Sequence, residues 1–139
     1  MSVQAILAPL FVLVALTFVL LVWMGGVRYA AVRGGEVRVR DIALDQSGWP
    51  PRVQQISNCF ANQFQLPMLF YVLTILALFL HKADLLFVLM AWVFVVLRVL
   101  HAAIHVTSNH VGHRFQAFAA GMVVLLLMWV VFAVRILAL

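Results

Sequence analysis

Two arginines and four histidines lie close together near the end of an apolar segment, in the sequence RVLHAAIHVTSNHVGHR from Arg98 to Arg114. At helical spacing Arg98, His101 and His105 fall at positions i, i+3 and i+7, so they share one face. Guanidinium groups present fixed planar donors that suit carboxylates, phosphates or a thiolate. The stripe predicts a site for an anionic ligand, on a face that must contact protein or water rather than lipid.

A second polar stripe lies in the preceding apolar segment, within VQQISNCFANQFQLP. Its carboxamides fall at positions i, i+3, i+7 and i+10, which is one helical face, and they are Gln55, Asn58, Asn62 and Gln65. Carboxamides bind peptide-like groups as donors or as acceptors. Pro67 is expected to kink the helix just beyond them. The two stripes together predict one polar, cationic pocket.

The composition indicates what kind of elements hold these stripes. The chain has 139 residues, of which 67% are hydrophobic and only 9% are charged, and this leaves too little polar surface for a soluble globule. A membrane span takes roughly 20 residues, so the length allows about four spans. We predict an all-α integral membrane protein, a four-transmembrane-helix bundle in a single domain of residues 1–139. The expected spans are residues 5–27, 53–80, 85–106 and 115–135, with a cytoplasmic loop at about 28–52.

The charge pattern predicts the topology. A net charge of +5 could suggest nucleic acid as a partner, but the arginines cluster beside the spans, where they set orientation. The predicted loop carries five of them, namely Arg28, Arg33, Arg38, Arg40 and Arg52. The loop is therefore expected on the cytoplasmic side, with both termini on the periplasmic side of a bacterial inner membrane and no nucleic-acid partner. This topology brings both stripes to the same depth in the inner half of the membrane.

A metal site is the sharper alternative for the histidines. His101 and His105 have the i, i+4 spacing that can bind a metal. No carboxylate or thiolate set accompanies them, because Asp84 is expected on the other side and Cys59 is the one cysteine. We therefore predict no metal.

Over essentially its whole length the sequence resembles the MAPEG family, the membrane-associated proteins in eicosanoid and glutathione metabolism. The most specific segments are GEVRVR, NQFQLPMLFY, and RVLHAAIH followed nine residues later by Arg114. Members are trimers of four-helix subunits that bind glutathione at subunit interfaces in the cytoplasmic half of the membrane. The resemblance implies a homotrimer with glutathione as co-substrate, and it is closest to bacterial members of unassigned substrate.

By this resemblance Arg114 is the catalytic arginine that stabilises the glutathione thiolate. Arg38 matches a loop arginine that reaches glutathione from the adjacent subunit. The other implied glutathione-binding residues are Asn62, Gln65, Arg98, His101 and His105. The resemblance thus implies a glutathione-dependent transferase or peroxidase, acting on a lipophilic electrophile that enters from the lipids.

The sequence departs from the family pattern at four positions. Gln65 replaces the usual glutamate, and His105 stands where some members have tyrosine. Phe115 stands where prostaglandin E synthase has serine, and Ala61 where mammalian members carry arginine, so eicosanoid chemistry is not implied. Gln65 and Phe115 favour an alternative, a non-catalytic membrane scaffold or lipid-binding subunit. An ion or proton path through the histidines is a third possibility.

Several of these residues also have purely structural explanations. Arg114 could reach the headgroups as a boundary arginine. Arg98 could bond the carboxamide stripe of the preceding span. Asn58, Asn62 and Gln65 could hold helices together, which is a common use of carboxamides in membranes.

Overall fold

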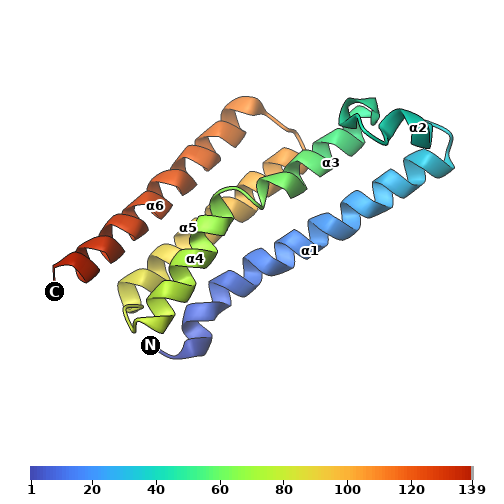
Figure 1. Ribbon diagram of the computed structural model, residues 1–139. Coiled ribbons are helices and arrows are strands. Elements are labelled where there is room, and N and C mark those ends of the chain that lie inside the picture. The colour runs from blue at the N-terminus through green and yellow to red at the C-terminus, as the bar shows by residue number, and fades with distance from the viewer. Residues whose placement is uncertain (139) are drawn as a thin grey trace.

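A computed structural model describes residues 1–138, and Figure 1 shows that its long segments are all helices. Four stretches are long and apolar enough to cross a membrane. They are α1 (Val3–Arg33), the pair α3 (Pro51–Asn62) and α4 (Leu66–Phe79), α5 (Leu85–Val106) and α6 (Val111–Leu137). The loop after α1 holds two short elements, α2 (Val39–Ile42) and the 3-10 helix η1 (Gln46–Gly48). The prediction of an all-α integral membrane protein with a four-helix bundle is confirmed.

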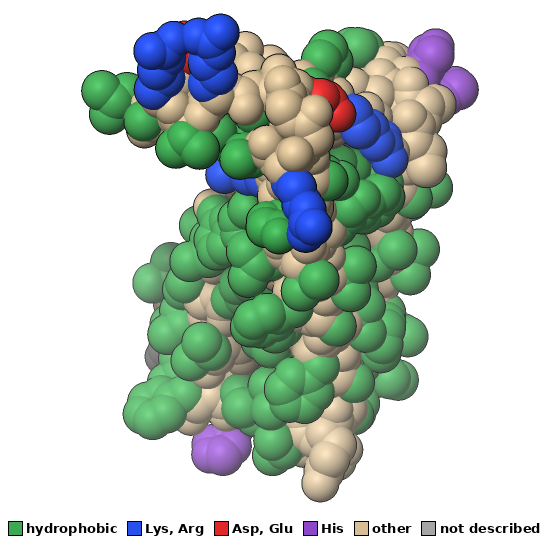
Figure 2. All heavy atoms as spheres, turned by 90° about the vertical axis from the view of Figure 1, so that its right-hand side faces the viewer, with side chains coloured by type: hydrophobic (Ala, Val, Ile, Leu, Met, Phe, Trp, Pro, Cys, Tyr) green, Lys and Arg blue, Asp and Glu red, His purple; other side chains and the backbone are tan. Residues whose placement is uncertain are grey.

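The helices pack side by side, with α4 and α5 between α1 and α6 (Figure 1). Both chain termini lie at one end of the bundle, and α2 and α3 lie at the other, which we call the loop end. Figure 2 shows hydrophobic side chains covering the body of the molecule, with basic side chains, which here are arginines, gathered toward the loop end. This is the distribution that a lipid-embedded bundle with one strongly cationic end requires.

The first helix extends further than the sequence indicated. The expected span ended near Gly25 and Gly26, but α1 continues to Arg33. It ends where Gly35 adopts the left-handed region at φ +75°. The Gly35 N–H donates to the Val32 carbonyl and the Glu36 N–H to the Ala31 carbonyl, which is a Schellman motif. The polar end of α1 therefore projects beyond the apolar span and carries arginines into the loop region.

The second span is broken inside the carboxamide stripe rather than beyond it. α3 ends at Asn62, and α4 begins at Leu66, with Pro67 in its first turn. A proline lacks the N–H for the carbonyl four residues before it and its ring crowds that carbonyl, which here belongs to Gln63. An interruption at Pro67 is present, but its expected position just beyond the stripe was wrong, because a proline disturbs the helix on its N-terminal side.

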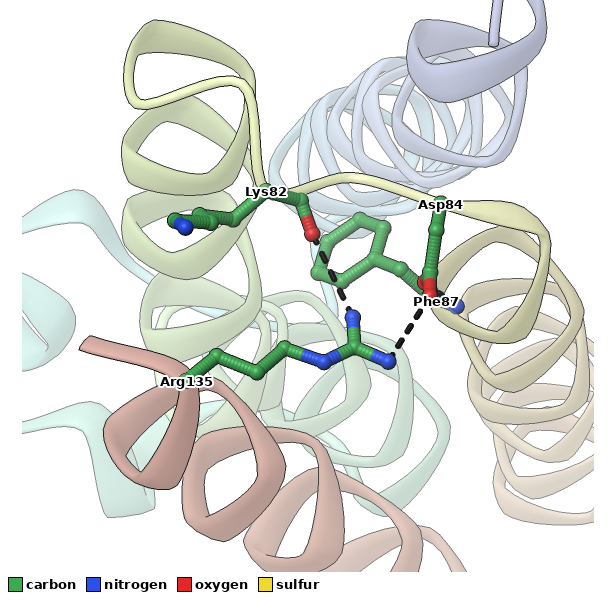
Figure 3. Close-up of polar contacts among 4 residues, drawn as sticks. All are labelled: Lys82, Asp84, Phe87 and Arg135. Atoms are coloured by element: carbon green, nitrogen blue, oxygen red, sulfur yellow. Dashed lines mark hydrogen bonds and ion pairs between the residues drawn. The ribbon is translucent and has the colours of Figure 1, made fainter. Parts of the chain in front are cut away.

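A hydrogen-bonded clamp fixes the end of the bundle near the termini (Figure 3). The Asp84 carboxylate caps α5 by accepting from the Phe87 N–H at 3.0 Å. Arg135 at the end of α6 lies 2.7 Å from the same carboxylate and donates to the Lys82 carbonyl at 3.4 Å. The clamp joins the α4–α5 connection to the last turn of α6.

The clamp predicts a small acid-sensitive contribution to stability. The hydrogen bond from Arg135 holds the pKa of the Asp84 carboxyl below its usual value. Such a group stabilises the fold above its unfolded pKa of about 3.9, and the effect is lost as the pH falls through the lower, folded pKa. Asp84→Asn keeps a capping side chain but removes the charge. Because the pair is half exposed, we expect a loss of at most about 1 kcal/mol near neutral pH.

Thermal unfolding of both proteins in detergent, near neutral pH and well below pH 3.9, tests this expectation. The midpoint of Asp84→Asn should be lower near neutral pH and should equal that of the wild type in acid. An equal difference at both pH values would contradict the electrostatic origin.

Candidate functional site

A cavity of about 440 Å³ lies toward the loop end of the bundle, between α3, α5 and α6. We call it the Arg114 cavity. Polar groups on three of its sides come from segments that are far apart in the sequence. The lining residues are Asn58, Ala61, Asn62, Gln65, His101, His105, Val111, Arg114, Phe115 and Phe118. The structure therefore brings the carboxamide stripe and the histidine stripe together around one arginine.

The guanidinium of Arg114 is held in place by the turn that precedes α6. Its Nη1 atom donates to the Asn109 Oδ1 atom at 2.6 Å. Asn109 adopts the left-handed region at φ +50°, which asparagine tolerates better than most residues. Arg114 lies in the first turns of α6, where the helix dipole also favours an anion. The wall formed by α6 is thus positive and partly fixed before any ligand arrives.

The two histidines of α5 are buried and lie against each other. Their ring centroids are 5.7 Å apart in an edge-on arrangement, and the His101 ring is 5.8 Å from that of Phe118. The Nδ1 atom of each ring is buried without a hydrogen-bond partner among residues 1–138. Buried polar atoms are normally satisfied, so these two nitrogen atoms are exceptions within the described chain, while other atoms of both rings line the cavity.

Arg98 lies deeper and does not line the cavity. Its side chain is 1% exposed, and its Nη2 atom donates to the Asn62 carbonyl at 3.3 Å. That carbonyl is at the end of α3, where the helix leaves acceptors without intrahelical partners. Arg98 therefore stabilises the break between α3 and α4 through a backbone carbonyl rather than a side-chain carboxamide, and its predicted contact with glutathione stays a prediction. Its Nε and Nη1 atoms have no partner in the described part of the chain.

The first residue of the carboxamide stripe has a structural role. The Nε2 atom of Gln55 donates to the carbonyls of His105 and Thr107 at 2.7 and 3.2 Å. Arg52 donates to the next free carbonyl, that of Val106, at 2.5 Å. These bonds satisfy the C-terminal carbonyls of α5 and fix the depth of the histidine stripe against α3.

Comparison with known proteins assigns this architecture to a family. A model of the MAPEG family matches residues 6–134, which is nearly the whole chain. The chain belongs to the MAPEG family. No curated protein and no solved structure matches it. The MAPEG family includes glutathione transferases and peroxidases.

One residue of the MAPEG pattern lies away from the cavity. Arg38 is exposed at the start of α2 and borders a separate hollow with Glu36 and Asp41. Within a single chain it does not line the Arg114 cavity, because the loop lies over the end of α1. Its assignment to the glutathione site of an adjacent subunit stays a prediction.

Sequence reasoning on this MAPEG chain missed the hydrogen bond that Arg114 donates to Asn109. An asparagine in a short turn carries no signal in the sequence of a contact with the following helix. Only the fold shows that its side chain points back to α6. Phe118 was also missed, since a phenylalanine in an apolar span is indistinguishable from lipid-facing residues by sequence. No group of three or more histidine, cysteine or acidic side chains with metal-binding geometry occurs within residues 1–138.

Proposed function

We propose that this protein is a glutathione-dependent transferase or peroxidase that acts on a lipophilic electrophile at the membrane. The observation that supports this best is the composition of the Arg114 cavity. One guanidinium, three carboxamides and two imidazoles line it, and no acidic side chain of the described chain does. Its volume of about 440 Å³ falls within the range of roughly 300–1,000 Å³ for small-molecule sites.

The arrangement suits a peptide with carboxylates and a thiol. The carboxamides of Asn58, Asn62 and Gln65 can donate to and accept from peptide groups. The guanidinium of Arg114 can stabilise the thiolate by charge-assisted hydrogen bonding. In a homotrimer, Arg38 of an adjacent subunit would supply a second cation for a glutathione carboxylate. His101 and His105 would form the inner wall of the site.

The chemistry would need a thiolate rather than a metal. A nearby cation lowers the pKa of a thiol, so the nucleophile forms near neutral pH and the proton leaves to solvent. In a transferase, the sulfur forms a bond to an electrophilic carbon, and the leaving group departs with the bonding electrons. In a peroxidase, two glutathione molecules reduce one hydroperoxide to an alcohol and water, and they become one disulfide.

The hydrophobic side of the cavity indicates how such a substrate would arrive. Phe115 is 67% exposed, and Val111 is exposed beside it, both at the start of α6. In a membrane these side chains face the lipid boundary, so a lipophilic molecule could enter laterally. We place the loop end on the cytoplasmic side and the termini on the periplasmic side, because the arginines gather at the loop end (Figure 2).

Titration of glutathione into detergent-purified protein tests the proposal. The wild type should bind saturably and show the ultraviolet absorbance of a bound thiolate. Arg114→Ala should lose that absorbance and most of the affinity. Arg33→Ala is the matched control, because Arg33 is a loop-end arginine whose one side-chain partner within residues 1–138 is Tyr29, and it lies outside the cavity. Absence of binding by the wild type at millimolar glutathione would contradict the proposal.

The alternative, a non-catalytic scaffold or lipid-binding subunit, has one structural observation in its favour. Gln65 contributes a neutral carboxamide to the cavity, and no carboxylate there can hold the ammonium group of glutathione. The same titration separates the two proposals, since a scaffold predicts no bound thiolate in any variant.

The hydrogen bond between Arg114 and Asn109 predicts a second effect on glutathione affinity. Asn109→Gly preserves the left-handed backbone but removes the acceptor of the Arg114 Nη1 atom. The guanidinium must then be ordered on binding, at a cost of about 0.5–1.5 kcal/mol per mobile side chain. We expect the dissociation constant for glutathione to rise roughly two- to tenfold. The midpoint of thermal unfolding should not change. Unaltered affinity would show that Asn109 has no positioning role.

A further inference from the structure

The turn between α5 and α6 holds a pair of histidines that the proposed glutathione chemistry does not use. His110 is the N-cap residue of α6, and His113 lies in the first turn of that helix. Both side chains are exposed and neither lines the Arg114 cavity, and Figure 2 shows histidine side chains on the surface at the loop end. Their ring centroids are 4.1 Å apart, with the ring planes inclined at 32°. The two imidazoles therefore stack on each other where the chain enters α6.

The cap of α6 requires one protonation state of His110. The His113 backbone N–H donates to the His110 Nδ1 atom at 3.1 Å. An imidazole nitrogen accepts a hydrogen bond only when it carries no proton, so this bond needs a neutral His110 with its hydrogen on Nε2. The usual capping residues accept through a side-chain oxygen, which keeps its lone pairs near neutral pH. A histidine at this position makes the start of α6 sensitive to protons.

Gly112 provides the space for this cap. A Cβ atom added at Gly112 would lie 3.1 Å from the Cε1 atom of His110 and 3.4 Å from its Nδ1 atom. The imidazole ring thus packs directly on the backbone of the first turn. His110, Gly112 and His113 build the cap together, and a larger residue at the middle position would displace the ring.

The surroundings of the cap contain no group that would hold an imidazolium in place. The N-terminus of a helix carries a partial positive charge, and the second imidazole stacks on the first. The other charged or titratable groups at this end of the bundle are Arg114 of α6, His105 of α5, and Arg52 of α3, which is bonded to the end of α5. All of them are basic. No carboxylate within residues 1–138 forms an ion pair with His110 or His113.

The cap is continuous with the contacts that fix Arg114. Asn109, which accepts from the Arg114 guanidinium, directly precedes His110. The Arg114 backbone N–H donates to the His110 carbonyl at 2.9 Å, so the cap residue also accepts the first hydrogen bond of the helix. When the cap opens, the first turn of α6 loses one of the bonds that hold it. The backbone between Asn109 and Arg114 is then less well fixed, and so is the guanidinium.

We propose that His110 and His113 form a proton-sensitive cap that controls the anion affinity of the Arg114 cavity. Histidines ordinarily change their charge between about pH 8 and about pH 5. At the upper end of this range His110 caps α6, and Asn109 holds Arg114 at the cavity. At the lower end a proton from solvent binds to Nδ1 of His110, the bond from His113 breaks, and the first turn of α6 loosens. The link to ligand affinity rests on the proposed function, whereas the cap does not depend on it.

Hydrogen exchange of the whole protein in detergent, corrected for the intrinsic effect of pH on exchange, tests the cap. The peptide containing the His113 and Arg114 amides should lose protection about fivefold between about pH 8 and about pH 5, as loss of a cap predicts. His110→Asn supplies an acceptor that does not titrate in this range, so its protection should be the same at both pH values. His81→Asn changes an exposed histidine at the other end of the bundle and should behave as the wild type does. Equal protection of the wild type at both pH values would overturn the proposal.

The affinity for glutathione sulfonate tests the control of the cavity. This analogue keeps the same charge across the pH range, so a change in its binding reports on the protein. Its dissociation constant should rise about fivefold between about pH 8 and about pH 5 for the wild type, but less than about twofold for His110→Asn. Any titration of His101 or His105 is common to both proteins and does not affect this comparison.

The two measurements separate failure of this proposal from failure of the proposed function. An equal change in affinity for the wild type and His110→Asn would show that His110 does not control the cavity, although the cavity binds the analogue. Absence of binding by both proteins at either pH would contradict the proposed function and the control of the cavity together. Hydrogen exchange would still decide whether the cap responds to protons.

Discussion

Replacement of Arg114 by methionine is expected to lower kcat/KM of a glutathione-dependent reaction by about 10²–10³-fold, the usual loss when one donor to a developing anion is removed. Methionine preserves most of the side-chain length in the Arg114 cavity but removes the charge and all donors. The loss of rate should appear at subsaturating substrate concentrations. Both the formation of the glutathione thiolate and the positioning of that thiolate depend on the Arg114 guanidinium. Conjugation of a generic lipophilic electrophile, followed spectrophotometrically, measures it.

Two companion variants give this prediction its specificity. Arg114→Lys keeps the charge but loses the planar fork that bonds Asn109, so it should lie between the wild type and Arg114→Met. Arg33→Met changes a loop-end arginine outside the cavity and should be neutral. The pH profile adds a separate readout, since loss of the cation should move the rise in rate to higher pH. A rate unchanged by Arg114→Met would remove Arg114 from the mechanism.

Gly121→Leu is expected to cause the largest loss of stability, of about 1–3 kcal/mol, because it forces a side chain into the contact between α5 and α6. Gly121 is buried, and a Cβ atom there would lie 3.8 Å from the Phe94 ring and 3.9 Å from Leu97. One carbon atom fits at these distances, but the branch of a leucine does not. The ring of Phe94 cannot move away easily, because it stacks on Phe70 with centroids 5.0 Å apart. Small residues at such contacts let membrane helices approach closely.

Gly121→Ala is the matched control, because its single Cβ atom has room and alanine favours the helix. It should be neutral or slightly stabilising. Thermal unfolding in detergent can be followed with a maleimide dye, since Cys59 is the one cysteine of the chain and is fully buried in the fold. Equal midpoints of thermal unfolding for the leucine and alanine variants would contradict this prediction. They would show that α5 and α6 can move apart without a loss of stability.

Much of the fold follows from the sequence because hydropathy is a local property. The four spans, the cationic loop between the first two, and the shared face of Arg98, His101 and His105 all depend on residue type and spacing alone. In lipid, each span must satisfy the hydrogen bonds of its backbone within itself. An apolar span of this kind therefore has little alternative to the helix. The MAPEG resemblance also lay in local segments, and the family match over residues 6–134 confirms it.

Local rules were less successful at the ends and interruptions of helices. The glycine pair Gly25–Gly26 suggested the end of the first span, but α1 continues because nothing nearby opposes it and the Schellman bonds form only at Gly35. The break between α3 and α4 precedes Pro67, and the buried guanidinium of Arg98 satisfies a carbonyl that the break exposes. Residues on another helix thus help to decide where this helix can be interrupted.

The sequence by itself therefore determined that the protein is a four-span membrane helix bundle of the MAPEG family, with a cationic end and two polar stripes that could meet. Only the tertiary structure decided that Gln55 holds helices together while Asn62 and Gln65 line a cavity, that Asn109 fixes Arg114, and that His110 caps α6. The physical reason is that hydropathy sets which segments enter the membrane. The rotation and depth of each helix against its neighbours, which depend on contacts between distant residues, set where each polar side chain points.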